Sequence, residues 1–141
     1  MKNFKHKTPI QVRFSDMDMM GHANNAVYSS YIEHARLRYF EEVVAEGEWS
    51  KQEGLILARL EIDFRSPLFN KDEVFVYTRC ARMGTKSFDM ECVIVRVKNN
   101  TEEIIADTKT VIVCFDYHTG KTVPISEVRK KKIAAYEGVT V

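Results

Sequence analysis

The sequence predicts an α+β domain in which one antiparallel sheet curls around one long helix. Apolar residues recur at helical spacing in the first third of the chain, and with a period of two in the last two thirds. Turn residues, Gly84 and then Asn99-Asn100, separate the later runs, and tight turns join antiparallel strands. A length of 141 residues fits one domain, 1–141, with its own core.

The long helix follows a short strand and a polar loop. The strand is expected from Lys7 to Phe14 and the loop from Ser15 to Asn24. Asn24 or Asn25 would cap the helix, because a short side-chain oxygen can accept from an orphan backbone N–H. The helix is expected from Asn25 to Val44, and one face carries Tyr28, Ile32, Ala35, Tyr39 and Val43. Its wide apolar coverage predicts that other structure wraps it.

Alternation defines the strands that follow the helix. Leu60, Ile62 and Phe64 share one side and charges share the other, as in a half-buried strand. Strands are expected over Arg59–Arg65, Glu73–Met83, Ser87–Val97 and Ile104–Asp116, and a short helix over Ser126–Tyr136. The sheet would therefore have five strands. Its outer faces and edges would carry Phe75, Tyr77, Val93 and Val95, and this apolar surface predicts at least a dimer.

Composition excludes several function classes. Lys and Arg number 21 against 20 Asp and Glu, so nothing favours a nucleic-acid partner, and the basic run 129–132 is expected to be a solvated helix face. No apolar stretch approaches the ~18 residues of a membrane span, and the first ten residues do not form a secretory signal. The three cysteines lack the spacing of a zinc site or a disulfide scaffold, which favours buried thiols in a cytoplasmic protein.

The polar loop ahead of the long helix concentrates groups that can do chemistry. It carries Asp16, Asp18 and His22 before Asn24 and Asn25. Unpaired N–H groups at a helix start can stabilise negative charge on a carbonyl oxygen, and a nearby carboxylate can act as base or nucleophile. A thioester suits such a site because its thiolate leaves readily. Capping and turn chemistry explain the same residues without catalysis, and for Asp16 a loop carboxylate bonded to backbone is favoured.

The stretch from Val12 to Arg36 resembles a family signature. It fits the pattern RxxDxDxxGHxNNxxYxxYxExAR, which is similar to that of hot-dog-fold acyl-CoA thioesterases of the 4-hydroxybenzoyl-CoA thioesterase type. The segment 116–124 also resembles the family's exit from its last strand. The resemblance implies the hot-dog fold, a homodimer or homotetramer, and a site formed between two subunits.

The resemblance also implies roles for three residues. Asp18 matches the catalytic second aspartate of the family, and the backbone N–H of Asn25 matches the group that polarises the thioester carbonyl. His22 matches a catalytic candidate in the branch that includes plant acyl-ACP thioesterases. The chain departs from the branch similar to the Tol–Pal-associated enzymes, which has histidine at the position of Asn25 and often tyrosine at that of Phe14.

Substrate binding would use basic groups after the helix. Arg59, Arg82, Lys86 and Ser87 are candidates for the coenzyme A phosphates, although for Lys86 a solvated hairpin charge is favoured. Neither a metal nor a separate cofactor is expected, since coenzyme A is part of the substrate.

The expected function is hydrolysis of an acyl-CoA, or an acyl-ACP, to the free acid and thiol. The alternatives are a hot-dog dehydratase or hydratase acting on a hydroxyacyl or enoyl thioester, and a non-catalytic module that binds acyl thioesters.

Overall fold

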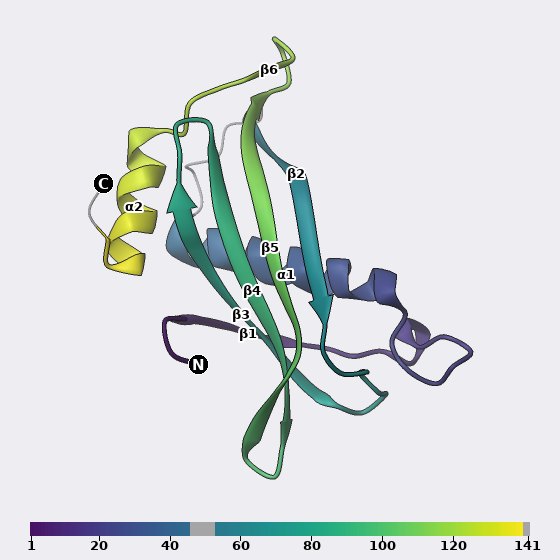
Figure 1. Ribbon diagram of the computed structural model, residues 1–141. Helices are drawn as coiled ribbons and strands as arrows, with labels where there is room; N and C mark the ends of the chain where they lie inside the picture. The colour runs from purple at the N-terminus through teal and green to yellow at the C-terminus, as the bar shows by residue number, and fades with distance from the viewer. Residues whose placement is uncertain (46–52, 140–141) are drawn as a thin grey trace.

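An antiparallel sheet curves around one long helix, α1, which passes behind its strands (Figure 1). The computed structural model describes residues 1–45 and 53–139. In chain order the elements are β1 (His6–Ile10), the 3-10 turn η1 (Phe14–Asp16), α1 (Asn25–Val43), β2 (Glu53–Phe64), β3 (Glu73–Met83), β4 (Ser87–Lys98), β5 (Thr101–Asp116), β6 (Lys121–Thr122) and α2 (Glu127–Glu137). The strand order β1-β3-β4-β5-β2, with β6 paired to β5, confirms the α+β class and the curled sheet.

The sheet differs from the prediction in the bounds and in the number of its strands. β2 begins at Glu53 rather than at Arg59, and β5 begins at Thr101 rather than at Ile104. β1 ends at Ile10 rather than at Phe14, because Ile10 already pairs with Val74 and β3 begins only one residue before it. The chain then turns into η1, and the Phe14 ring is 82% exposed. A sixth strand, β6, pairs with the end of β5, and its two residues are too few to produce a periodic pattern.

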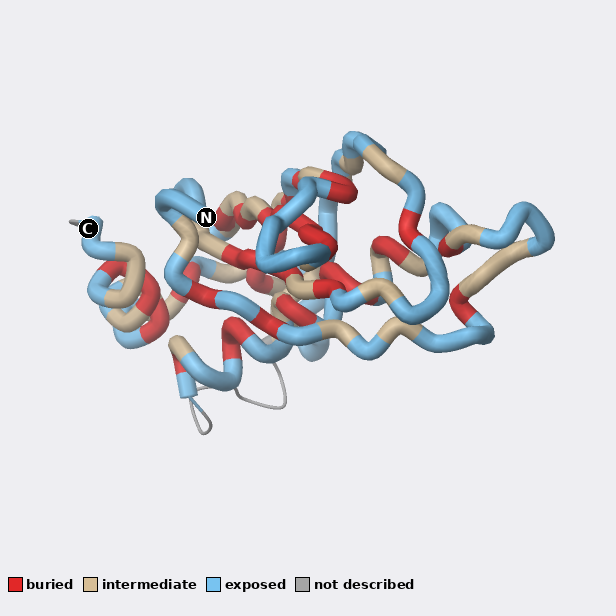
Figure 2. Tube along the Cα trace, turned by 90° about the horizontal axis from the view of Figure 1, so that it is seen from below, coloured by how far each residue is buried: buried red, intermediate tan, exposed pale blue. Residues whose placement is uncertain are grey.

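The long helix is close to its prediction and forms most of the core. Asn24 is the N-cap, and its side chain accepts from the backbone N–H of Ala26. Buried residues of α1 contribute to two apolar clusters against the sheet, and Figure 2 shows the buried positions gathered between helix and sheet. The first cluster includes Tyr28, Ile32 and Ala35, and the second includes Tyr39, Phe40 and Phe88.

A third cluster corrects the prediction of an apolar outer face. Tyr77, Val93 and Val95 are 7%, 9% and 0% exposed, and Phe4 and Phe75 pack against them. The rings of Phe4 and Tyr77 meet edge to face with centroids 6.2 Å apart. The N-terminal segment therefore covers residues that were expected to drive assembly.

The C-terminal helix is less solvated than its basic run predicted. Arg129 is buried, and the Lys132 ammonium donates to the Val44 carbonyl at 2.9 Å, just past the end of α1. The run therefore helps to join α2 to α1. The cysteines do pack as expected: Cys92 and Cys114 are buried, and burial raises the pKa of the half-buried Cys80 to about 12. No helix among residues 1–45 and 53–139 is long and apolar enough to cross a membrane.

Candidate active site

The loop between η1 and α1 is closed by its own backbone hydrogen bonds. Met17 pairs with Ala23 as an isolated β-bridge, and the Asp18 N–H donates to the His22 carbonyl at 3.0 Å. The Gly21 N–H donates to the Asp18 carbonyl at 3.1 Å, and Gly21 has a φ of +85°, a backbone conformation that favours glycine. The loop therefore holds Asp18 at the start of a tight turn.

The Asp18 carboxylate is half-buried and only partly engaged. Its Oδ1 accepts from the Met20 N–H at 2.8 Å, and Oδ2 has no hydrogen-bond donor within the described residues. The side chain lines an open cavity of about 820 Å³ together with Phe14, Met17, Met19 and Val27. One carboxylate oxygen is thus free to meet a ligand in a largely apolar cavity.

The first turn of α1 borders the same cavity and leaves one donor unused. The Asn24 side chain accepts from Ala26 N–H and its carbonyl accepts from Val27 N–H, both at 2.9 Å. The N–H of Asn25 has no acceptor in the described part of the chain. Asn24, Ala26 and Val27 all line the Asp18 cavity. The positive end of the helix dipole therefore lies at its edge, and Asn25, whose N–H is unused, lies between cavity-lining residues but itself lines a second cavity.

His22 and Asn25 line a second, smaller cavity on the other side of this turn. Its volume is about 250 Å³, and Phe64 and Tyr28 form part of its wall, with ring centroids 5.0 Å apart. The His22 Nδ1 lies 3.3 Å from the Ala23 carbonyl oxygen. Asp18 does not line this cavity. A single chain thus places Asp18 and His22 on two sides of the same loop-to-helix junction.

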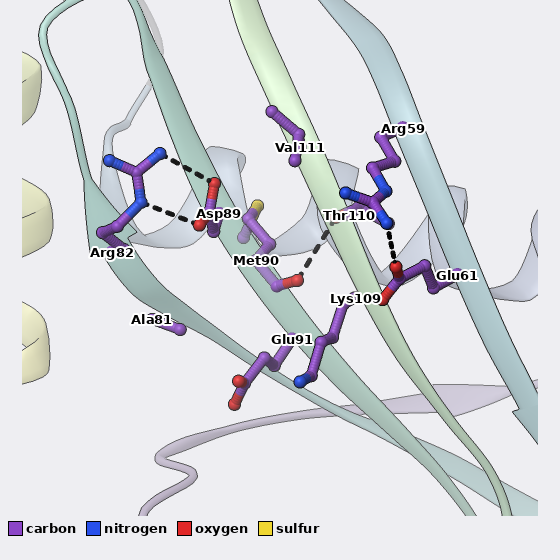
Figure 3. Close-up of a pocket in the computed structure, with 10 residues that line it drawn as sticks. All are labelled: Arg59, Glu61, Ala81, Arg82, Asp89, Met90, Glu91, Lys109, Thr110 and Val111. Carbon is purple, nitrogen blue, oxygen red and sulfur yellow. Dashed lines mark hydrogen bonds and ion pairs between the residues drawn. The ribbon is translucent and has the colours of Figure 1, made fainter.

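Two of the predicted substrate-binding residues lie on the face of the sheet away from α1 (Figure 3). There Arg82 donates twice to Asp89, at 2.8 and 3.2 Å, and Arg59 donates to Glu61. Both arginines line a groove of about 330 Å³ that Lys109 also lines. Each arginine therefore already has a carboxylate partner in the chain, and neither shares a cavity with Asp18.

The other two predicted substrate-binding residues lie at the turn between β3 and β4. The Gly84 N–H donates to the Ser87 carbonyl at 2.7 Å, and Ile125, just before α2, donates to Thr85 at 2.9 Å. The turn therefore lies at the α2 end of the molecule, whereas the Asp18 loop lies at the N-terminal end of α1 (Figure 1). One chain does not bring Lys86 and Ser87 to Asp18.

One contact in this region could not be predicted from the amino-acid pattern. Tyr31 is buried beside the predicted apolar face of the helix, and its hydroxyl donates to the buried carboxylate of Asp16 at 2.7 Å. Helical spacing identifies a buried tyrosine without showing what its hydroxyl meets.

Comparison with known proteins places the chain in a family. Residues 12–133 match the family model of the Thioesterase-like superfamily. A thioesterase from Thermus thermophilus, whose crystal structure is described as complexed with coenzyme A and Zn, is 34% identical, with a TM-score of 0.83 and complete coverage of both chains.

Two further relatives are described as thioesterases. The long-chain acyl-CoA thioesterase FadM of Escherichia coli is 26% identical over 89% of this chain and 95% of its own. The chloroplastic acyl-acyl carrier protein thioesterase ATL3 of Arabidopsis thaliana is 27% identical over 79% of this chain. The chain spans 58% of the length of ATL3 and 59% of the length of two other curated relatives that it matches. On the match over residues 12–133, the chain belongs to the Thioesterase-like superfamily.

Proposed function

We propose that this protein hydrolyses an acyl thioester, an acyl-CoA or an acyl-ACP, to the free acid and the thiol. One observation carries the proposal: a carboxylate with a free oxygen lines a largely apolar cavity, and the first helical turn at the edge of that cavity has an unused N–H donor. A carboxylate base and a donor for a developing oxyanion are the two groups that thioester hydrolysis needs.

In the proposed reaction, Asp18 activates a water molecule or attacks the carbonyl carbon itself. The carbonyl oxygen takes up negative charge and accepts from the Asn25 N–H, which the helix dipole makes a better donor. The C–S bond breaks, the thiolate leaves, and the water supplies the acid's hydroxyl and the proton that the thiolate takes up. His22 is a second candidate for proton transfer at the junction. The reaction consumes only water and the thioester, and it is assigned to the cytoplasm.

The walls of the cavity and the relatives favour an acyl-CoA substrate. Phe14, Met17, Met19 and Val27 offer apolar surface to an acyl chain. The Thermus thermophilus relative is described as complexed with coenzyme A, and FadM is described as a long-chain acyl-CoA thioesterase. ATL3 is described as an acyl-acyl carrier protein thioesterase, so acyl-ACP is the second candidate substrate class.

The proposal includes a homodimer or homotetramer. Arg59, Arg82, Lys86 and Ser87 lie away from Asp18 in their own chain, so we assign them to coenzyme A bound at the Asp18 of a second copy. Exposed apolar side chains surround the Asp18 loop, which supports a covering partner: Phe14 is 82% exposed and Met20 is 79% exposed.

The proposal is tested by a thiol-release assay over aromatic, short, medium and long acyl-CoAs. Asp18→Asn should lower kcat by about 100-fold or more, as expected for loss of a general base or nucleophile. Asp63→Asn is the matched control, because this carboxylate on β2 is 73% exposed and its ion pair with Arg65 is long, at 3.8 Å. Near-normal hydrolysis by Asp18→Asn would remove Asp18 from the mechanism.

The same assay separates the alternative functions. Addition of water to an enoyl-CoA without release of thiol would identify a hydratase. Calorimetric binding of acyl-CoA with no turnover of any thioester would identify a binding module.

A further inference from the structure

A second aspartate, Asp16, lies two residues before Asp18 but is closed off from the cavity. Its side chain is 2% exposed, and it is absent from the cavity wall to which Ser15 and Met17 on either side contribute. A substrate in that cavity would not reach the Asp16 carboxylate. Its role must therefore pass through other groups.

Three donors from two directions hold the Asp16 carboxylate. Oδ2 accepts from the backbone N–H of Arg13 at 2.9 Å and from the hydroxyl of Tyr31 at 2.7 Å, and Oδ1 accepts from the Arg13 guanidinium at 3.1 Å. Arg13 precedes η1, and Tyr31 lies in the second turn of α1. Burial alone would raise the pKa of Asp16, but these hydrogen bonds outweigh it and hold the pKa below its usual value.

The backbone of Asp16 is fixed to the helix as well. Its carbonyl accepts from the N–H of Asn24, the N-cap, at 3.0 Å. Two hydrogen bonds thus join Asp16 to the α1 region. Its carbonyl accepts from the N-cap, and its carboxylate accepts from Tyr31. The loop that leaves Asp16 carries Asp18 two residues later, and the chain returns at Asn24 immediately before the free N–H of Asn25.

We propose that Asp16 is a positioning residue for the proposed hydrolysis, and that the Asp16–Tyr31 hydrogen bond fixes Asp18 relative to the Asn25 N–H. This inference rests on the proposed function. A carboxylate and an oxyanion donor act on the same carbonyl group only if their separation is fixed, and a displacement of about 1 Å can cost on the order of 100-fold in rate.

The chain offers a matched pair of variants for the test. Tyr31→Phe removes the hydroxyl that binds Asp16, and Tyr39→Phe removes the hydroxyl of another buried tyrosine, which donates to Glu137 at 2.6 Å two turns further along α1. On the whole protein, Tyr31→Phe should lower kcat by about 10- to 100-fold with KM changed less than about two-fold. Tyr39→Phe should keep the wild-type kcat, although both variants lose thermal stability to a similar extent.

A second variant keeps the test decisive if Tyr31→Phe does not fold. The Arg13 side chain is 66% exposed, so Arg13→Ala removes one bond to Asp16 without opening the core, and it should lower kcat several-fold. Wild-type kcat in the folded Tyr31→Phe variant, or in Arg13→Ala where Tyr31→Phe is unfolded, would overturn the inference. An equal loss of kcat in Tyr39→Phe would also overturn it, because the effect would then be general destabilisation.

A measurement without substrate separates this inference from the proposed function. The Asp18 and Gly21 amides close the loop, so their hydrogen exchange should accelerate in Tyr31→Phe and stay unchanged in Tyr39→Phe. If no thioester is turned over but exchange changes in this way, the proposed function fails while the fixing of the loop by Asp16 stands. If exchange is the same in both variants, the inference fails whatever the activity.

Discussion

At the scale of single residues, the two aspartates of the loop have opposite environments. Asp16 has three donors and almost no exposed surface, whereas Asp18 has one donor and a cavity in front of it. A carboxylate whose two oxygens both accept hydrogen bonds stabilises structure, whereas a carboxylate with one free oxygen can still bind or activate a ligand. The two aspartates lie two residues apart in the sequence, and only their hydrogen-bond partners in the structure distinguish their roles.

The lowered pKa of Asp16 predicts how stability changes with pH. Asp16 stabilises the fold at pH values above its unfolded pKa, about 3.9, and this contribution is lost as the pH falls through the lower folded value. Asp16→Asn should therefore be less stable than wild type at pH 7, and the difference should shrink below about pH 4. Urea unfolding between pH 7 and pH 3 measures this; a difference that stays constant with pH would contradict it.

At the scale of elements, the apolar face of α1 is interrupted by one charged residue, Arg36. Arg36 lies between the residues that α1 contributes to the first and second apolar clusters. Burial lowers the pKa of Arg36 and the charge of Glu33 opposes this shift, but no hydrogen bond or ion pair holds the guanidinium within residues 1–45 and 53–139. Partial desolvation of a cation without a carboxylate partner costs free energy.

Replacing this cation should therefore stabilise the isolated chain. We expect Arg36→Met, a substitution of similar length and helix propensity, to raise the free energy of unfolding by about 1 kcal/mol. Arg38→Met on the exposed face of α1 is the control and should change it by less than about 0.5 kcal/mol. Urea unfolding compares the two. A loss of stability in Arg36→Met would contradict this expectation.

At the scale of the whole molecule, one edge of the sheet is open. β2 pairs only with β5, and side chains on its helix-facing side remain accessible: Leu57 is 42% exposed and Phe64 is 49% exposed. A long edge strand with apolar side chains invites pairing with another chain. Assembly is thus favoured at this edge and around the Asp18 loop, and not at the outer sheet face around Tyr77, which the N-terminal segment covers.

Light scattering at micromolar concentration should therefore show a dimer or a tetramer. Leu57→Lys should shift the protein toward monomers and lower its thioesterase activity, because the proposed site is shared. Ile104→Lys is the control. Ile104 is 42% exposed, as Leu57 is, but it lies in the part of β5 that does not pair with β2. A fully active monomer would contradict the shared site.

The sequence by itself determined the features that depend on neighbours along the chain. The helix from Asn25, the β3–β4–β5 meander, the turn at Asn99-Asn100 and the loop carrying Asp18 follow from periodicity, capping and turn chemistry, and the motif identified the family. These signals are local, so they are read from one segment at a time.

Only the tertiary structure decided which distant groups meet. It ended β1 close to the start of β3, covered Tyr77 with Phe4, and gave Asp16 the hydroxyl of Tyr31. It also placed His22 and Asp18 in separate cavities of one chain. The physical reason is that burial and hydrogen bonding of a side chain are set by what packs against it, and a period along the chain shows which face is buried but not which partner covers it.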